Sequence, residues 1–183
     1  LGRGLLVAAH LLVAATAHGR ERRTAVAVGL GGGAGDGQTS TRKRILITGG
    51  TGSLGKVLTR SLLAGKFGRP ERITIFSRDE GKHHDMRLDF HHMKAASEDI
   101  VYADAASVLQ FRVGDVRDYA SLTPVLRDVD VVFNAAALKQ VPSCEYFVSE
   151  AVATNVLGPR NIVRAIAEND LTIDTVIGIS TDK

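Results

Sequence analysis

The stretch RILITGGTGSLG, residues 44–55, decides the fold of this chain. A short apolar run at residues 45–47 leads directly into Gly49, Gly52 and Gly55, and an apolar periodicity typical of a helix follows. This order predicts a buried strand, a tight turn and the start of a helix. Glycine suits the turn because the backbone takes unusual dihedral angles there and comes close to a pyrophosphate. The helix N-terminus offers that phosphate unpaired N–H groups and a positive dipole end, so the stretch predicts a dinucleotide site.

Glycine-rich turns also occur without a ligand, so the other strands bear on this prediction. Apolar runs of strand length recur along the chain and alternate with helical patterns; they are residues 72–77, 109–116, 131–134 and 174–180. The alternation predicts an α/β fold, a Rossmann-type doubly wound parallel sheet with right-handed crossovers, truncated after the fifth strand. In such sheets the ligand lies beyond the carboxyl ends of the strands. Polar residues from Thr51 to Lys183 follow those ends, which favours a functional site there.

The segment after the second strand is expected to be helical. Residues 79–107 have the pattern of a helix with an irregular tail, in which Met86, Phe90 and Met93 have the spacing of core residues. Four histidines have the spacing of one helix face, but their polar neighbours favour a solvated face over a metal site. They are His83, His84, His91 and His92.

Two later helices are expected. Asp118 follows the third strand and is placed to cap the helix that comes next. Residues 144–169 have the pattern of one long helix, which Pro159 should bend or break.

The end of the second strand bears on the choice of dinucleotide. An acid at this place usually holds the ribose hydroxyls of NAD, whereas an arginine accommodates the 2′-phosphate of NADP. Here Arg78 can make a charge-assisted contact with a phosphate, which favours NADP, while Asp79 keeps NAD open. After the third strand, Asp115 is placed to accept a hydrogen bond from the adenine amino group. The small residues 135–137 after the fourth strand suit either close approach of the cofactor or tight helix packing.

Composition excludes several classes of protein. The chain has 183 residues, of which 44% are hydrophobic and 23% charged, as in an ordinary soluble globular domain. Its net charge is +3, it has no tryptophan and it carries no basic stripe interleaved with aromatic residues, so we expect no nucleic-acid partner. The single cysteine, Cys144, excludes an internal disulfide and fits a reducing, cytoplasmic compartment.

The first 42 residues differ in composition from the rest. Residues 5–17 are apolar apart from His10, and this run is shorter than a membrane-spanning helix. It resembles the apolar core of a signal peptide but has no clear cleavage site. A glycine-rich stretch at 29–37 has the composition of a flexible linker. We therefore expect a flexible extension over 1–42 and a dinucleotide-binding domain over 43–183, with a membrane-associated remnant as the less favoured alternative.

Six motifs along the chain resemble those of one family: GGTGSLG, SRDE, GDVRD, AAALKQVP, TNVLG and STDK. Together they are similar to the extended short-chain dehydrogenase/reductase superfamily. Within it they most resemble the nucleotide-sugar 4,6-dehydratases of capsular polysaccharide and glycan biosynthesis, including the UDP-N-acetylglucosamine 4,6-dehydratases. The resemblance runs over about residues 43–183. SRDE, AAALK and STDK make it specific, whereas the glycine motif alone does not.

The resemblance implies a lyase that holds NADP tightly and acts on a UDP-sugar. It implies a set of cofactor-binding residues at the strand ends: Gly49, Thr51, Gly52, Ser53, Leu54, Gly55, Ser77, Arg78, Asp79, Lys82, Asp115, Val116, Ala135, Ala136 and Ser180. It places Lys139 and Thr181 near the substrate, and it makes Asp182 and Lys183 the acid/base pair.

The reaction so implied begins with hydride transfer from C4 of the hexose to NADP⁺. The resulting ketone acidifies the C5 hydrogen, which Lys183 removes if burial lowers its pKa, and Asp182 assists departure of the C6 hydroxyl. The hydride then returns to C6. A frayed, solvated charge pair is the alternative interpretation of Asp182 and Lys183.

Two departures from the family pattern stand out. Residues 91–107 have the appearance of an insertion, and the family's Tyr-x-x-x-Lys pair lies downstream of STDK. The tyrosines present are not followed by lysine four residues later; they are Tyr102, Tyr119 and Tyr146. We therefore expect the 183-residue chain alone to be inactive. The alternatives are a non-catalytic dinucleotide-binding module and a nucleotide-sugar 4-epimerase, and homo-oligomer formation is left open.

Overall fold

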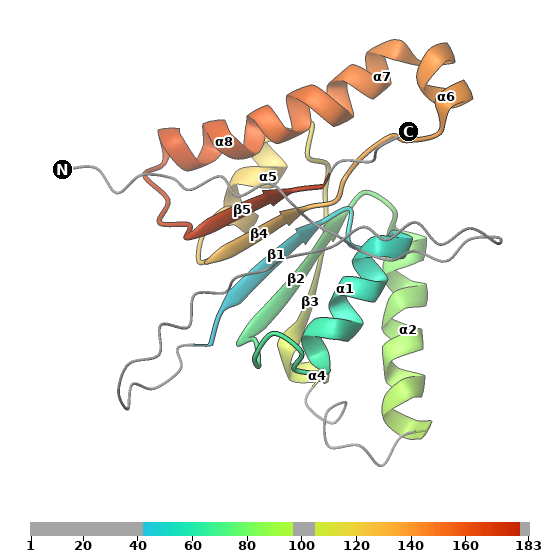
Figure 1. The fold of residues 1–183 in the computed structure, drawn as a ribbon, viewed down its shortest axis with the longest axis vertical. Helices are drawn as coiled ribbons and strands as arrows, with labels where there is room; N and C mark the ends of the chain where they lie inside the picture. The colour runs from blue at the N-terminus through green and yellow to red at the C-terminus, as the bar shows by residue number, and fades with distance from the viewer. Residues whose placement is uncertain (1–41, 97–104, 180–183) are drawn as a thin grey trace.

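The computed structural model describes residues 42–96 and 105–179. Its five strands are all parallel and form one sheet in the order β3-β2-β1-β4-β5, as Figure 1 shows. They are β1 (Arg44–Thr48), β2 (Arg72–Ser77), β3 (Leu109–Val113), β4 (Val131–Asn134) and β5 (Thr175–Gly178). The chain winds outward from β1 in one direction to β3 and then in the other to β5. The predicted doubly wound Rossmann-type α/β fold is confirmed.

Helices cover both faces of the sheet (Figure 1). They are α1 (Ser53–Leu63) and α2 (Glu80–Ala96) on one face and α5 (Tyr119–Leu126) and α8 (Gly158–Glu168) on the other, with a short α4 (Ala105–Val108) before β3. The apolar residues of strand β1 contribute to the hydrophobic cores on both faces of the sheet. Ile45 and Ile47 pack in a core cluster with Leu62, whereas Leu46 packs in a second cluster with Ile162. Successive strand residues point to opposite faces, so a central strand must be apolar throughout.

The turn after β1 requires glycine at two positions. Gly49 has φ +64, and a methyl group there would lie 2.7 Å from the carbonyl oxygen of Ala135. A methyl group at Gly55 would lie 2.2 Å from the carbonyl oxygen of Gly50, which is closer than any real contact. Helix α1 therefore packs directly on the turn, and the turn on the end of β4.

The segment predicted as one long helix over 144–169, bent or broken at Pro159, is helical without interruption over 148–168 and is broken only at Phe147. It comprises α6 (Val141–Tyr146), α7 (Val148–Val152), a π-helical turn η1 (Ala153–Leu157) and α8. The break is at Phe147, whose φ of −110 and ψ of 58 are not helical. Pro159 is the second residue of α8 and directly follows the wide turn of η1, through which the helix continues with αR dihedrals at Leu157 and Gly158.

The expectation for the α2 histidines is wrong at His83, which is only 1% exposed, whereas His84 is exposed. Met86 and Phe90 are buried as predicted, and the side chain of Met93 lies outside the described residues. Positions 83, 86 and 90 share one helix face, so His83 belongs to the core-facing stripe. The polar neighbours along the sequence lie on the other face of α2.

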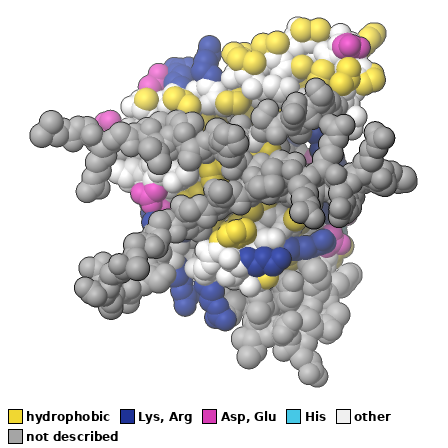
Figure 2. Space-filling view, viewed as in Figure 1, with side chains coloured by type: hydrophobic (Ala, Val, Ile, Leu, Met, Phe, Trp, Pro, Cys, Tyr) yellow, Lys and Arg dark blue, Asp and Glu magenta, His cyan; other side chains and the backbone are white. Residues whose placement is uncertain are grey.

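Hydrophobic side chains gather on the surface over α6 and α7 (Figure 2). Val148, Val152 and Val156 follow one another at four-residue spacing and are 58%, 45% and 57% exposed. These three valines form an exposed apolar row along α7 and η1. Within the described ranges, no helix combines the length and apolar character needed to cross a membrane.

Candidate functional site

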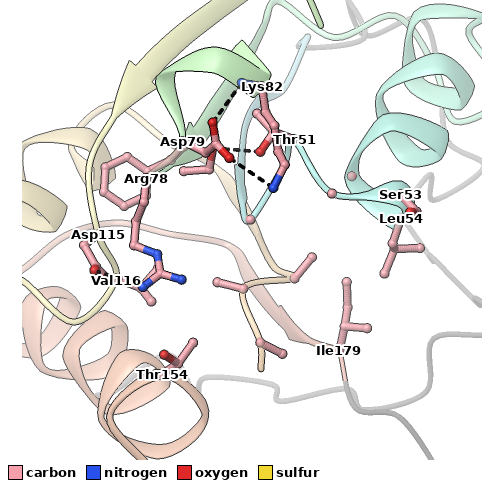
Figure 3. Close-up of a pocket in the computed structure, with 18 of the residues that line it drawn as sticks. Thr51, Ser53, Leu54, Arg78, Asp79, Lys82, Asp115, Val116, Thr154 and Ile179 are labelled. Atoms are coloured by element: carbon pink, nitrogen blue, oxygen red, sulfur yellow. Dashed lines mark hydrogen bonds and ion pairs between the residues drawn. The ribbon is translucent and has the colours of Figure 1, made fainter. Parts of the chain in front are cut away.

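A cleft of about 300 Å³ opens at the carboxyl ends of the strands (Figure 3). Fourteen of the fifteen predicted cofactor-binding residues line it, together with Lys139; the fourteen are Gly49, Thr51, Gly52, Ser53, Leu54, Gly55, Ser77, Arg78, Asp79, Lys82, Asp115, Val116, Ala135 and Ala136. The fifteenth, Ser180, lies outside the described residues, as do Thr181, Asp182 and Lys183. Ile179, the last described residue, lines the cleft just before them.

The floor of the cleft is the glycine turn and the start of α1. Gly52 caps α1 without a side-chain hydrogen bond, and the first turn of the helix has no acidic residue. No side chain of this turn therefore competes for its backbone N–H groups. These groups lie at the positive end of the helix dipole and can bind an anion. With no side chains on Gly49, Gly52 and Gly55, the cleft here can admit a pyrophosphate against the backbone.

The residues after β2 form a charged wall of the cleft. Arg78 is half exposed, and its Nη1 lies 3.8 Å from Asp115 Oδ2. Asp79 is held by Lys82, since Oδ1 accepts the Lys82 backbone N–H at 3.0 Å and Oδ2 lies 3.0 Å from Lys82 Nζ. These two contacts lower the pKa of Asp79. Figure 3 shows Arg78 reaching toward Asp115 and the Asp79–Lys82 pair beside Thr51.

Asp115 is organised by an arginine that sequence reasoning missed. The Arg117 backbone N–H donates to Asp115 Oδ1 at 2.9 Å, and Arg117 Nε donates to Oδ2 at 2.8 Å. Burial raises the pKa of Asp115, but the hydrogen bonds and charge of Arg117, assisted by Arg78, outweigh burial and hold that pKa below its ordinary value. Arg117 also pairs with Glu150 and so ties the β3–α5 loop to α7. At the start of α5, Asp118 accepts the Ala120 N–H at 3.0 Å, as the predicted cap.

The loop after β4 is held in place by Asn155 of η1. Asn155 Nδ2 donates to the Leu138 carbonyl at 2.8 Å, and the Leu138 N–H donates to Asn155 Oδ1 at 2.9 Å. Cys144 Sγ contacts the same carbonyl at 3.4 Å, in keeping with a packing role. Of the small residues after β4, Ala136 lines the cleft and also packs against the core cluster that includes Ile162 of α8, so the packing alternative applies and the cofactor alternative stays a prediction.

Thr154 is a further residue that sequence reasoning missed. Its side chain is 5% exposed and lines the cleft, and within the described ranges its Oγ1 has no hydrogen-bond partner. A buried hydroxyl without a partner costs about 1–3 kcal/mol unless a ligand satisfies it. The glycine cradle and this hydroxyl both fit a polar ligand such as a dinucleotide. Thr154 belongs to the TNVLG motif, which was the only available signal.

Comparisons with known proteins agree with this geometry. A family described as polysaccharide biosynthesis protein matches residues 45–183. Proteins named UDP-glucose 4-epimerase from Rickettsia typhi and Rickettsia conorii are each 46% identical over 142 residues, which cover 77% of this chain and 37% of theirs. The chain thus spans little more than a third of the length of these curated relatives.

Two solved structures share the fold. Pen from Bacillus thuringiensis aligns with a TM-score of 0.60 and 30% identity over 71% of this chain and 36% of its own. A double mutant of dTDP-glucose 4,6-dehydratase from Streptomyces venezuelae, with NAD bound, aligns with a TM-score of 0.59 and 25% identity over 75% of this chain and 39% of its own. Since the family match covers most of the chain, from β1 to the last residue, the chain belongs to the polysaccharide biosynthesis protein family.

Proposed function

We propose that this chain is the NADP-binding part of an enzyme that alters a UDP-sugar at C4 during polysaccharide biosynthesis. One observation carries the proposal: each predicted cofactor-binding residue within the described ranges lines the same cleft at the carboxyl ends of the strands. The relatives named UDP-glucose 4-epimerase support a UDP-sugar as the substrate.

The electrostatics of the cleft support NADP over NAD. Arg78 is half exposed and shares only a 3.8 Å contact with Asp115, so it can turn to a 2′-phosphate. Asp79 is engaged by Lys82 and is less suited to holding free ribose hydroxyls. The ionised Asp115 can accept the adenine amino group through Oδ1, because Arg117 takes both lone pairs of Oδ2 with its Nε and Nη2 but only one of Oδ1 with its backbone N–H.

The dinucleotide would accept a hydride from the sugar and return it. The protein's part is to hold the cofactor's phosphates on α1 and Arg78 and to keep Asp115 ionised beside the adenine. The loop fixed by Asn155 presents Lys139 at the cleft, where the resemblance places the substrate. Positioning of this kind makes hydride transfer effectively intramolecular.

Two reactions at C4 each have a specific observation behind them. The curated relatives favour 4-epimerisation, in which the hydride returns to C4 from the other face. The STDK motif favours 4,6-dehydration, in which Lys183 removes the C5 proton and Asp182 protonates the departing C6 hydroxyl. The solved 4,6-dehydratase structure is the more distant likeness of the two.

The two reactions are separated by their products. The experiment incubates the protein, with these residues in their full-length context, with NADP⁺ and either UDP-glucose or UDP-N-acetylglucosamine. A product of unchanged mass with inverted C4 identifies an epimerase, whereas a product lighter by one water identifies a dehydratase. Lys183→Ala should abolish dehydration, and Lys66→Ala, an exposed lysine remote from the cleft, is the matched control. Tight NADP binding without turnover of either sugar would contradict both reactions and support the alternative of a non-catalytic dinucleotide-binding module.

A further inference from the structure

The buried histidine of α2 makes an unusual pair of contacts with the last residue of β2. His83 Nε2 lies 2.7 Å from Ser77 Oγ and 3.2 Å from the Ser77 carbonyl oxygen. The imidazole packs edge-on against Phe111, with ring centroids 5.6 Å apart. Its other nitrogen, Nδ1, is buried and has no hydrogen-bond partner among the described residues.

These contacts determine which ring nitrogen carries the hydrogen. A carbonyl oxygen can only accept, so Nε2 must be a donor if it is to face the Ser77 carbonyl favourably. The same N–H lies within reach of Ser77 Oγ and is shared between the two oxygens. Burial lowers the pKa of His83, and the charge of Arg87 lowers it further; together they outweigh the Ser77 carbonyl and Asp79, which raise it, and so favour the neutral ring. The resulting form is neutral, with hydrogen on Nε2 and a bare Nδ1.

Ser77 continues this contact toward the cleft. Its Oγ lies 2.9 Å from Thr51 Oγ1, and both residues line the cleft. The two hydroxyl groups carry two hydrogen atoms in total, and one of these hydrogen atoms makes the hydrogen bond between Ser77 Oγ and Thr51 Oγ1. If His83 donates to Ser77, the second hydrogen is left over for the cleft. If His83 instead accepted, both hydrogens would be consumed and the pair could offer a ligand only lone pairs.

We propose that His83 is a positioning residue: through its Nε2–H it keeps the Ser77–Thr51 hydroxyl pair as a hydrogen-bond donor to a phosphate oxygen of the bound dinucleotide. This inference rests on the proposed cofactor binding and extends it to a side chain that does not itself line the cleft. The ligand oxygen must be an acceptor without a hydrogen, which a phosphate provides and a ribose hydroxyl provides only in part.

Nuclear magnetic resonance on the ligand-free chain tests the tautomer directly. Nitrogen shifts and two-bond couplings of the His83 ring distinguish a protonated Nε2 from a protonated Nδ1. We expect the Nε2–H form at pH 7. Hydrogen on Nδ1 would overturn the inference without touching the proposed function.

Calorimetric titration with NADP⁺ tests the action through Ser77. His83→Leu keeps an apolar filling but loses the donor, so NADP⁺ should bind about three- to tenfold more weakly, whereas His83→Gln retains an N–H and should restore most of the affinity. In a Ser77→Ala background, His83→Leu should have no further effect, because the hydroxyl it acts on is gone. A purely structural role would instead give the same loss in both backgrounds, which would overturn the inference. A wild-type chain that binds neither NADP⁺ nor NAD⁺ would overturn the proposed function and, with it, the ligand part of this inference.

Discussion

Replacement of Arg78 by alanine is expected to weaken NADP⁺ binding selectively. Arg78 follows β2 at the wall of the cleft, is half exposed and lies 3.8 Å from Asp115. Its guanidinium is the charge expected to reach the 2′-phosphate, which is the only chemical difference between NADP⁺ and NAD⁺. The substitution therefore removes a contact that only one of the two cofactors can make.

The magnitude follows from the two contacts that Arg78 must exchange. A charge-assisted hydrogen bond to a phosphate contributes about 1.5–3 kcal/mol. A half-exposed pair such as Arg78–Asp115 contributes about 0–1 kcal/mol, and this part is lost when the guanidinium turns to the ligand. The net value is about 1–2 kcal/mol, which corresponds to roughly five- to thirtyfold weaker binding of NADP⁺.

Isothermal titration calorimetry with both cofactors measures this difference. Arg78→Ala should lower NADP⁺ affinity by that factor and leave NAD⁺ affinity within about twofold. Arg60→Ala, on the exposed side of α1, is the matched control and should change neither. Equal binding of NADP⁺ and NAD⁺ by the wild type would refute the reasoning, since no 2′-phosphate contact would then exist.

Four further outcomes are expected. Gly55→Ala should lower the melting temperature by several degrees and abolish NADP⁺ binding, because the added methyl group would lie 2.2 Å from a carbonyl oxygen of the glycine turn. Asp130→Asn should cost about 1–3 kcal/mol in urea unfolding near pH 7, since the carboxylate accepts the backbone N–H, Nε and Nη2 of Arg44. Arg44 holds the pKa of Asp130 below its ordinary value near 3.8, so this contribution is present above that pH and disappears as the pH falls through the lowered folded-state pKa, where mutant and wild type should converge. Val152→Lys should reduce any self-association seen by sedimentation without changing NADP⁺ affinity, because the valine lies on the exposed apolar row of α7 and η1. Deletion of residues 1–42 should leave NADP⁺ affinity and thermal stability unchanged, as the glycine-rich linker at 29–37 has too little apolar surface to dock on the domain; a clear loss of stability would show that the apolar run at 5–17 packs on the core.

Local patterns identified most of the sheet and the phosphate-binding turn. The five strands lie where apolar runs of strand length occur, although β3 ends at Val113, three residues before the predicted end. The turn at Gly49 and Gly55 followed from residue type alone, since only glycine fits a left-handed φ and a helix packed against the turn. Such features depend on neighbours within a few residues, so a single sequence contains them.

Helix boundaries and the burial of single polar residues were predicted less well. Apolar spacing over 144–169 is compatible with one helix and contains no sign of the break at Phe147, whereas Pro159 marks the region in which the π-helical turn occurs. His83 was assigned to solvent because its sequence neighbours are polar, yet it shares a face with Met86 and Phe90. In both cases the outcome depends on what the helix packs against, which periodicity alone does not specify.

The sequence by itself determined the α/β class, the strand ends at which the cleft opens and most of the residues that line it. Only the tertiary structure decided how those residues are held: Arg117 joins Asp115 to Glu150, and Asn155 fixes the loop at Leu138. Thr154 also brings to the cleft a buried hydroxyl that has no partner among residues 42–96 and 105–179. The physical reason is the separation along the sequence between the residues that interact. Strands, turns and caps arise from interactions within one or two turns of chain, whereas the contact of Arg117 with Glu150 joins residues 33 apart and exists only once the sheet has brought their loops together.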